Sequence, residues 1–282
     1  MSTTVSTTTR RAVRSIDGTT ISYETLGAGE GLLVVGGALR AARDYLPFAR
    51  ALSDSFTVHV IDRRGRGHSG PQGAEYSIAH ESEDLLAVQA ETGATIVFGH
   101  SYGGLVALEA ARHSAVFSEV VVYEPGVSIA GSIPGAWMGR YRERLAARDP
   151  WGAFATMARG AGAAPPALER MPLWSVKLIL RLFIKQQQWQ QIEPLLHATL
   201  AEHEQVAALD DTTLDRYQTI AARVLLLGGA NSRWFARTGL LAHLPDAIPN
   251  CTGELINGLD HTAPDEKAPE LIAHRVRRHL RG

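Results

Sequence analysis

The sequence predicts an α/β protein, in which helices flank a mostly parallel, eight-stranded sheet and a helical cap is inserted into the core. Two observations lead to this fold class. Short apolar, β-branched runs alternate with helical patterns over residues 11–129 and again over residues 218–282. Such alternation is typical of right-handed crossovers in a parallel sheet. Between these parts, residues 130–217 contain helical patterns separated by Pro and Gly but no convincing strand. We therefore expect one core in two pieces and one cap.

Composition narrows the class of protein further. The chain has 282 residues, of which 45% are hydrophobic and 20% charged, and its formal net charge is −1. This length allows one large core with an inserted subdomain, and the near-neutral charge gives no electrostatic footprint for nucleic acid. Cys251 is the only cysteine, which excludes an internal disulfide. No apolar run approaches the roughly 20 residues of a membrane span, and residues 1–10 lack the apolar region of a secretory signal. We expect a cytoplasmic protein with no membrane partner and a disordered tail over residues 1–10.

The elements before the cap follow from short patterns. Residues 11–16 and 21–26 alternate well enough for two strands, with Asp17-Gly18 as the hairpin turn between them. Four further strands are expected in this part of the chain, at residues 32–35, 56–62, 94–98 and 119–125. The helices expected after the first three of these cover residues 45–52, 77–91 and 105–111.

The elements after the cap repeat the same alternation. A strand is expected at residues 223–227, a helix at 233–244, a strand at 251–256 and a closing helix from about Ala268. Four of the five tryptophans fall within the cap, at Trp137, Trp151, Trp174 and Trp189. We expect the large apolar side chains there to form mostly the cap's own small core, with a minority lining a pocket.

The segment Gly99-His100-Ser101-Tyr102-Gly103 lies between a predicted strand and a predicted helix. Gly-x-Ser-x-Gly in this setting is the sequence form of a sharp turn that lifts one serine hydroxyl above a sheet. In so tight a turn, side chains two residues before and after the serine would collide with neighbouring elements, so both positions favour Gly. Ser101 is therefore a candidate nucleophile, the alternative being an ordinary Gly-rich turn with a solvated serine.

Other polar groups lie at the ends of predicted strands. A serine nucleophile needs a general base, a group that orients this base, and N–H donors for an oxyanion. In parallel sheets such groups gather at the carboxyl ends of the strands. The residues at or just after these ends are Gly36-Gly37-Ala38, Asp62, Ser101, Glu124, Asn231 and His261. Together they supply every group that acyl transfer requires.

With these motifs the chain resembles the α/β-hydrolase superfamily over nearly its whole length. The segment 99–103 looks like the family's nucleophile elbow, and the segment 62–69 looks like its D-x-R-G-x-G-x-S loop. The late Leu259-Asp260-His261 is similar to the family's histidine motif. The resemblance implies the α/β-hydrolase fold, Ser101 as nucleophile and His261 as general base. It also implies that the N–H groups of Tyr102 and Ala38 are the oxyanion donors.

The resemblance leaves the acid of the triad open. The family pattern G-x-x-D after the seventh strand reads Gly228-Gly229-Ala230-Asn231 here, so an amide replaces the usual carboxylate. An amide can hold a histidine in place but cannot stabilise the imidazolium charge. Glu124 ends the sixth strand, where some family members carry their acid. We predict Glu124 as the acid, with Asn231 as the alternative position, whereas Asp260 is disfavoured because adjacent side chains rarely point the same way.

Two further features are interpreted as structural. The segment 62–69 is expected to be a buried polar loop that braces the elbow by hydrogen bonds, and His100 is expected to have a structural role. No metal ion or cofactor is expected, because His197 and His203 lack a third ligand. A nicotinamide-binding fold is disfavoured because Gly36-Gly37 lacks the further glycines of G-x-G-x-x-G.

The sequence thus predicts a serine hydrolase, a monomer or a homodimer. It would cleave a carboxylic ester, thioester or lactone of a small, largely apolar substrate through an acyl-enzyme. C–C bond hydrolysis, acyl transfer and lyase chemistry stay open, since the fold hosts many reactions. A non-catalytic, ligand-binding role also stays open, because the family's usual Asp is absent at position 231.

Overall fold

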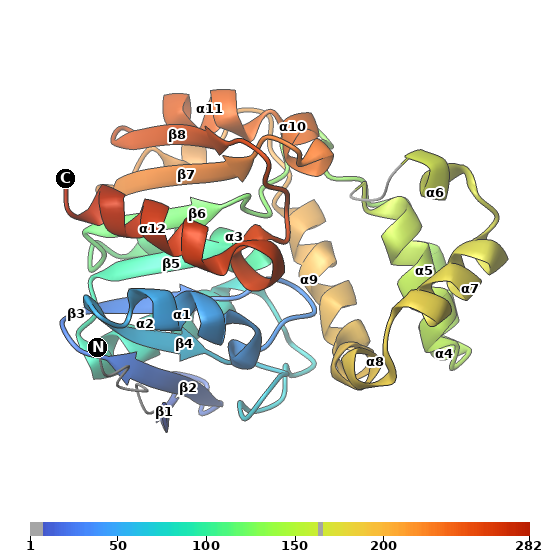
Figure 1. Ribbon diagram of the computed structural model, residues 1–282, viewed down its shortest axis with the longest axis horizontal. Coiled ribbons are helices and arrows are strands. Elements are labelled where there is room, and N and C mark those ends of the chain that lie inside the picture. The colour runs from blue at the N-terminus through green and yellow to red at the C-terminus, as the bar shows by residue number, and fades with distance from the viewer. Residues whose placement is uncertain (1–7, 163–165) are drawn as a thin grey trace, which may run out of the picture.

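The computed structural model describes residues 8–162 and 166–282. Its centre is an eight-stranded sheet in the order β1-β2-β4-β3-β5-β6-β7-β8 (Figure 1). The strands are β1 (Thr9–Arg14), β2 (Thr20–Gly27), β3 (Glu30–Val35), β4 (Phe56–Ile61), β5 (Ile96–His100), β6 (Glu119–Tyr123), β7 (Arg223–Gly229) and β8 (Cys251–Ile256). Strands β3 to β8 are mutually parallel, whereas β2 is antiparallel to both β1 and β4. The predicted fold class is confirmed.

The first strand begins earlier than expected. Thr9 pairs with Thr25 and Arg10 with Glu24 in the β1–β2 ladder, and an ion pair of 2.8 Å joins Arg10 to Glu24. Residues 9 and 10 therefore belong to the sheet, which corrects the expected tail over residues 1–10. Residues 1–7 of that tail lie outside the described residues.

Helices cover both faces of the sheet. One face is covered by α1 (Leu46–Leu52) and α12 (Pro269–Leu280), whose apolar side chains join one buried cluster with the strands. The opposite face is covered by α2 (Ile78–Thr92), α3 (Tyr102–His113) and α11 (Leu240–Ala247). Short helical turns lie between the longer elements, at η1 (Ala42–Tyr45), η2 (Glu193–Leu195), η3 (Asp215–Tyr217) and η4 (Ala263–Lys267).

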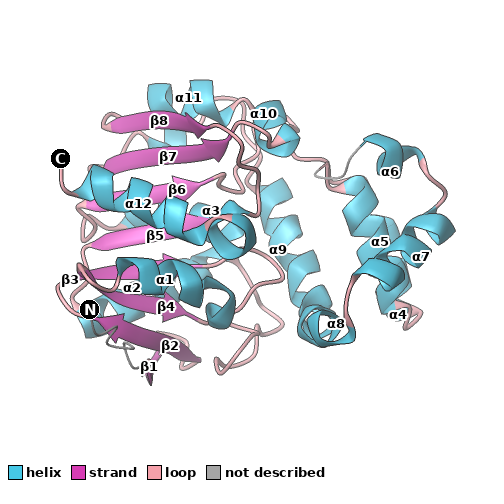
Figure 2. Cartoon of the chain, viewed as in Figure 1, coloured by secondary structure: helices cyan, strands magenta, loops and turns pink. Residues whose placement is uncertain are grey.

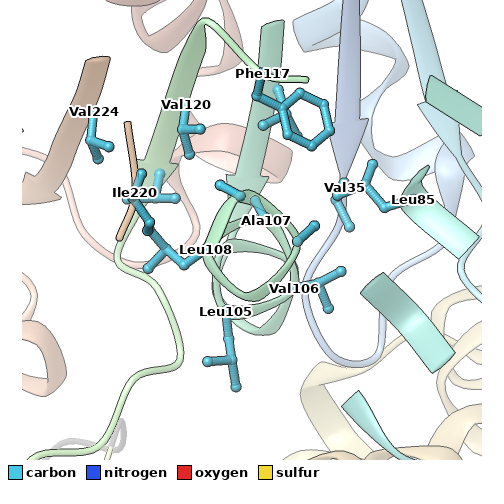
Figure 3. Close-up of a cluster of buried hydrophobic side chains, with 14 of the residues drawn as sticks. Val35, Leu85, Leu105, Val106, Ala107, Leu108, Phe117, Val120, Ile220 and Val224 are labelled. Atoms are coloured by element: carbon cyan, nitrogen blue, oxygen red, sulfur yellow. The ribbon is translucent and has the colours of Figure 1, made fainter. Parts of the chain in front are cut away.

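Helix α3 is held tightly against the middle of the sheet. Its Val106 and Leu108 lie in the same buried cluster as Val35 of β3 and Val120 of β6 (Figure 3). Each of these four side chains is 1% exposed or less. Because α3 begins directly after Ser101, this packing fixes the position of the candidate nucleophile.

The segment between β6 and β7 supplies the helices that lie beyond the carboxyl ends of the parallel strands (Figure 2). These are α4 (Met138–Ala146), α5 (Pro150–Gly160), α6 (Pro166–Arg170), α7 (Leu173–Phe183), α8 (Gln186–Ile192) and α9 (Leu196–Ala208). They all fall within residues 130–217, the range in which the sequence lacks strand patterns.

The cap has a small apolar core of its own. Trp137, which directly precedes α4, and Tyr141 of α4 lie in it with Trp189 of α8. The ring of Trp151 stacks on Trp189 with centroids 3.6 Å apart. Trp174 is different, since it is 71% exposed on α7. The expected cap core is therefore present, but Trp174 is not part of it.

One predicted helix is divided in two. The pattern over residues 233–244 corresponds to α10 (Arg233–Thr238) and α11, which are separated by Gly239. Gly239 has φ +70°, a left-handed conformation that ends α10. The expectation of a single helix is therefore wrong.

Candidate active site

Ser101 occupies a strained turn at the end of β5. Its φ and ψ are 54° and −122°, which a residue with a side chain rarely adopts. Hydrogen bonds hold this conformation. The Ser101 carbonyl accepts from the N–H groups of Gly104 at 2.9 Å and Gly126 at 2.8 Å, and the Ser101 N–H donates to the Tyr123 carbonyl at 3.0 Å.

The glycines of the motif are required by close backbone approach. A Cβ on Gly99 would lie 2.5 Å from the carbonyl oxygen of Gly103, and a Cβ on Gly103 would lie 2.2 Å from the carbonyl oxygen of Val35. Both distances are far inside van der Waals contact. The steric reason given for Gly two residues on either side of Ser101 is therefore confirmed.

The structure brings Ser101, His261 and Glu124 into one line of hydrogen bonds. His261 Nδ1 lies 2.7 Å from Glu124 Oε2, and His261 Nε2 lies 3.1 Å from Ser101 Oγ. A carboxylate only accepts, so Nδ1 carries the proton of the neutral ring and Nε2 presents its lone pair to the serine hydroxyl. This is the tautomer that a general base for Ser101 needs.

Glu124 reaches His261 because β6 and β7 are adjacent in the sheet. Its side chain is fully buried, and it accepts two further hydrogen bonds, from Gly229 N–H at 2.8 Å and from Ser232 Oγ at 2.7 Å. The backbone of Glu124 is also left-handed, with φ 43°. These hydrogen bonds hold the carboxylate in a single orientation.

Asn231 and Asp260 are directed elsewhere. Asn231 is exposed, its N–H donates to the Leu259 carbonyl at 2.8 Å, and within the described part of the chain its side chain has no hydrogen bond to His261. Asp260 accepts from Thr262 and forms an ion pair with Lys267. Among the described residues, neither side chain forms a hydrogen bond with His261, and the turn after β7 directs Ser232, not Asn231, toward the buried carboxylate.

The two expected oxyanion donors flank Ser101. Tyr102 is the first residue of α3, and Ala38 lies in the loop after β3 and lines the same cavities as Ser101. In the ranges that the structure describes, neither N–H has a protein acceptor. The backbones approach closely here, since a Cβ on Gly37 would lie 3.0 Å from Ser101 Cβ.

His100 connects the loop after β3 to the loop that carries the base. Gly37 N–H donates to Tyr45 Oη at 2.9 Å, Tyr45 Oη lies 2.6 Å from His100 Nδ1, and His100 Nε2 lies 2.9 Å from the His261 carbonyl oxygen. That carbonyl needs a donor, so Nε2 carries the proton and Nδ1 accepts from the tyrosine. Burial holds the pKa of His100 well below its ordinary value, which keeps the ring neutral. The sequence predicts a structural role for His100, but it did not reveal this series of hydrogen bonds.

The segment 62–69 is polar, and it is buried as expected at residues 62–64 and Arg66 but exposed at Gly67 and His68; it also braces more than the elbow. Arg63 donates to the carbonyl groups of Gly36 at 2.8 Å and Gly37 at 3.0 Å, so it holds the loop after β3. It also pairs with Glu81 of α2 at 2.7 Å and with Glu202 of α9 at 3.0 Å. The guanidinium lies 4.8 Å above the Tyr102 ring at the elbow. Arg63 thus connects the loop after β3, the elbow and the cap.

Two cavities meet at Ser101, and both are also lined by Ala38 and His261. The larger, of about 470 Å³, has a mixed lining that includes the polar side chains of Arg40, Gln188 and Gln191. The smaller, of about 220 Å³, lies under the cap and is mostly apolar; its lining includes Ile133, Met157, Ala161, Val206 and Trp234. The serine hydroxyl therefore faces two spaces of different polarity.

The family of the chain follows from comparison with known proteins. Residues 32–275 match the model of the alpha/beta hydrolase family. The chain belongs to this family. The resemblance drawn from the three sequence motifs is confirmed.

The similar proteins include hydrolases of several kinds. An α/β hydrolase from Sphaerobacter thermophilus DSM 20745 has a TM-score of 0.80 to this protein and 29% identity, over 96% of this chain and 100% of that one. An esterase from Rhodococcus sp. ECU1013 has a TM-score of 0.66 and 22% identity over 97% and 98% of the two chains, which shows the shared fold alone.

A curated relative is similar over a shorter length. The pimeloyl-[acyl-carrier protein] methyl ester esterase of Vibrio cholerae serotype O1 is 36% identical over 118 residues, which is 42% of this chain and 44% of that protein. The similarity therefore spans less than half of either protein. Separately, no helix within residues 8–162 and 166–282 of this protein has the length and apolar character needed to cross a bilayer.

Proposed function

We propose that this protein cleaves a carboxylic ester, thioester or lactone of a small, largely apolar substrate through a covalent acyl-enzyme. The observation that carries the proposal is the continuous line from Glu124 through His261 to Ser101, with separations of 2.7 Å and 3.1 Å. The name of the partial relative, a methyl ester esterase, supports the same class of substrate.

In the proposed reaction, Ser101 Oγ attacks the carbonyl carbon while His261 Nε2 accepts the hydroxyl proton. The oxyanion of the tetrahedral intermediate receives hydrogen bonds from the N–H groups of Tyr102 and Ala38. His261 then gives the proton to the leaving oxygen or sulfur, and the bond to the carbonyl carbon breaks. Water, deprotonated by His261, attacks the acyl carbonyl carbon of the acyl-enzyme. The bond to Ser101 Oγ then breaks, His261 returns the proton to Oγ, and the acid leaves. Glu124 stabilises the imidazolium that forms in each half of the reaction.

The smaller cavity suits the acyl group. Its lining includes Tyr102, which carries one proposed oxyanion donor, together with the apolar side chains of Met157 and Val206. His203 lines it as well, and burial lowers the pKa of this histidine, so the ring is uncharged near neutral pH. The larger cavity extends along Thr262 beside the base, where a leaving group must lie to receive its proton from His261.

Covalent labelling tests the proposal. We expect a fluorophosphonate to label the wild-type protein at Ser101 and not the variant Ser101→Ala. The same variant should lose about 10⁶-fold in turnover of short p-nitrophenyl esters, the loss typical of removing a serine nucleophile. A folded wild-type protein that is neither labelled nor active on these esters would contradict the enzyme proposal and favour a ligand-binding role.

A further inference from the structure

The outer side of α7 carries a cluster of exposed apolar side chains. Trp174, Leu178, Leu182 and Phe183 are 71%, 52%, 74% and 79% exposed, and we call them the α7 face. The other exposed large apolar side chains in the described part of the chain lie apart from α7: Ile16 and Val116 in loops, Leu255 on β8 and Leu271 on α12. Scattered exposed apolar residues are ordinary on a protein surface, whereas a contiguous patch marks an interaction site.

The α7 face lies at the end of the cap remote from the sheet (Figure 1). At 100° per residue, Trp174, Leu178 and Leu182 fall within an arc of about 80°, and the helix is about 16 Å long. Phe183, the last residue of the helix, is exposed about 100° beyond Leu182 and outside this arc. Val176 is the only residue of α7 that is buried. Half of the apolar side chains of the helix are therefore exposed to solvent.

Cationic side chains predominate on and beside α7, although Glu169 and Glu193 directly flank this stretch of the chain. From residue 170 to residue 192 the chain carries four cationic and no acidic side chains, at Arg170, Lys177, Arg181 and Lys185. Lys177 is paired with Asp149, and the Arg181 guanidinium lies 5.6 Å from the Trp151 ring. Arg170 and Lys185 are exposed, and among the residues with described positions neither has an acidic partner.

We propose that the α7 face docks the cap onto an anionic lipid bilayer. An interfacial helix buries Trp, Leu and Phe side chains at the boundary of headgroups and acyl chains, while its Lys and Arg side chains stay beside anionic headgroups. A second copy of this chain fits less well, because a symmetric contact would bring the cations of the two faces together. The proposal departs from the expectation, drawn from the sequence, that the protein has no membrane partner.

Docking through this face would bring the bilayer close to the candidate active site. Ile184 directly follows the α7 face and lines the larger cavity beside Ser101, as do Gln188 and Gln191 of α8. Esters that partition into a bilayer would therefore be concentrated near the helices that line this cavity. The docking itself is independent of the reaction at Ser101 and can be measured without any substrate.

Vesicle flotation with the full-length protein tests the proposal. We expect binding to vesicles of phosphatidylglycerol and phosphatidylcholine, with much weaker binding to phosphatidylcholine alone. Leu178→Gln combined with Leu182→Gln should weaken the binding about tenfold or more, because two apolar side chains no longer enter the interface. Arg170→Gln and Lys185→Gln should each weaken the binding about fivefold. Added salt should also weaken the binding, because it screens the attraction between these cations and the headgroups.

The matched control combines Leu255→Gln with Leu271→Gln, which changes two leucines of comparable exposure outside the α7 face. This variant should float with the vesicles like the wild type. All variants should keep the wild-type melting temperature. The proposal is overturned if the wild type does not bind anionic vesicles, or if both double variants bind equally well. It is also overturned if sedimentation shows a dimer that Leu178→Gln with Leu182→Gln dissociates, since a second copy would then cover the face.

Discussion

At the scale of single residues, the candidate site depends on which side chain orients His261. Asn231 stands after β7, at the family's usual position for the acid, and is exposed. Glu124 stands at the end of the neighbouring strand β6 and is fully buried. Its carboxylate accepts hydrogen bonds from Ser232 and from Gly229 N–H as well as from the histidine. A carboxylate with this many donors is fixed before the substrate arrives, which is what charge stabilisation in a transition state requires.

We predict that Glu124→Gln lowers kcat on p-nitrophenyl esters by about 10⁴-fold, because an amide favours the wrong histidine tautomer and cannot stabilise imidazolium. Asn231→Ala should change kcat less than about twofold, since ordinary surface substitutions have small effects. Steady-state kinetics of the two purified variants decides the matter. If the two losses came out in the opposite order, Asn231 would be the orienting group and the assignment of Glu124 would be wrong.

The series of hydrogen bonds from Gly37 through Tyr45 and His100 to the His261 carbonyl joins the loop after β3 to the loop that carries His261, and the proposed reaction uses both loops. Tyr45→Phe removes the hydroxyl that links Gly37 to His100 and leaves the Gly37 N–H without its acceptor. We expect it to lower the free energy of unfolding by about 1–3 kcal/mol, the cost of an unsatisfied buried donor. It should also lower kcat by about tenfold, because the loop with the proposed oxyanion donor Ala38 loses a support.

Tyr141→Phe is the matched control for this prediction. Tyr141 is equally buried, and its hydroxyl donates to the Leu196 carbonyl inside the cap at 2.8 Å. Urea unfolding should show a similar loss of stability for Tyr141→Phe, with kcat unchanged. Equal effects of the two variants on kcat would mean that the series of hydrogen bonds through His100 has no role in positioning.

At the scale of elements, the sequence was most informative where all the constraints lie close together in the chain. The elbow could be predicted because Gly99, Ser101 and Gly103 meet the same turn within five residues. The clash at Gly99 comes from that turn itself, whereas the clash at Gly103 is with Val35 of β3. The parallel strands could be predicted from their apolar runs. The start of the antiparallel strand β1 could not, because pairing with β2, and not composition, extends β1 to Thr9.

Other elements depend on information that local patterns do not contain. Gly239 divides a continuous helical pattern, since a glycine within a helix costs only about 1 kcal/mol and the pattern cannot show that its φ is +70°. The amphipathic pattern of α7 does not say which side meets the core, so the exposure of Trp174 could not be predicted. Arg63 and Glu202 are 139 residues apart, and only the folded chain brings them together.

At the scale of the whole molecule, the cap is joined to the core by buried charges. Arg63 and Arg66 extend from the loop after β4 to Glu202 of α9, and all three side chains are 2% exposed or less. Burial opposes ionisation of Glu202, but the two guanidinium groups hold the pKa of its carboxyl below the ordinary value. The carboxylate is therefore ionised at neutral pH, and the ion pairs stabilise the position of the cap over Ser101.

Removing this carboxylate should destabilise the protein strongly. Glu202→Ala leaves two buried guanidinium groups without their shared partner, and breaking a buried ion pair from one side costs about 3–5 kcal/mol. Glu204→Ala, two residues along the same helix, breaks a surface pair with Arg142 and should cost about 1 kcal/mol or less. Thermal unfolding at pH 7 compares the two variants directly. Equal losses would show that the buried charges do not secure the cap.

The same ion pairs predict how stability depends on pH. Because the pKa of Glu202 is lower in the folded protein than in the unfolded chain, its contribution is present above the ordinary pKa of a glutamate and is lost as the pH falls through the folded value. The wild type should therefore lose stability more steeply in acid than Glu202→Ala does, and the difference between them should shrink below about pH 4. Urea unfolding over this pH range measures the difference. A gap between the two proteins that stayed constant from neutral pH into acid would mean that lost packing, and not lost charge, destabilises the variant.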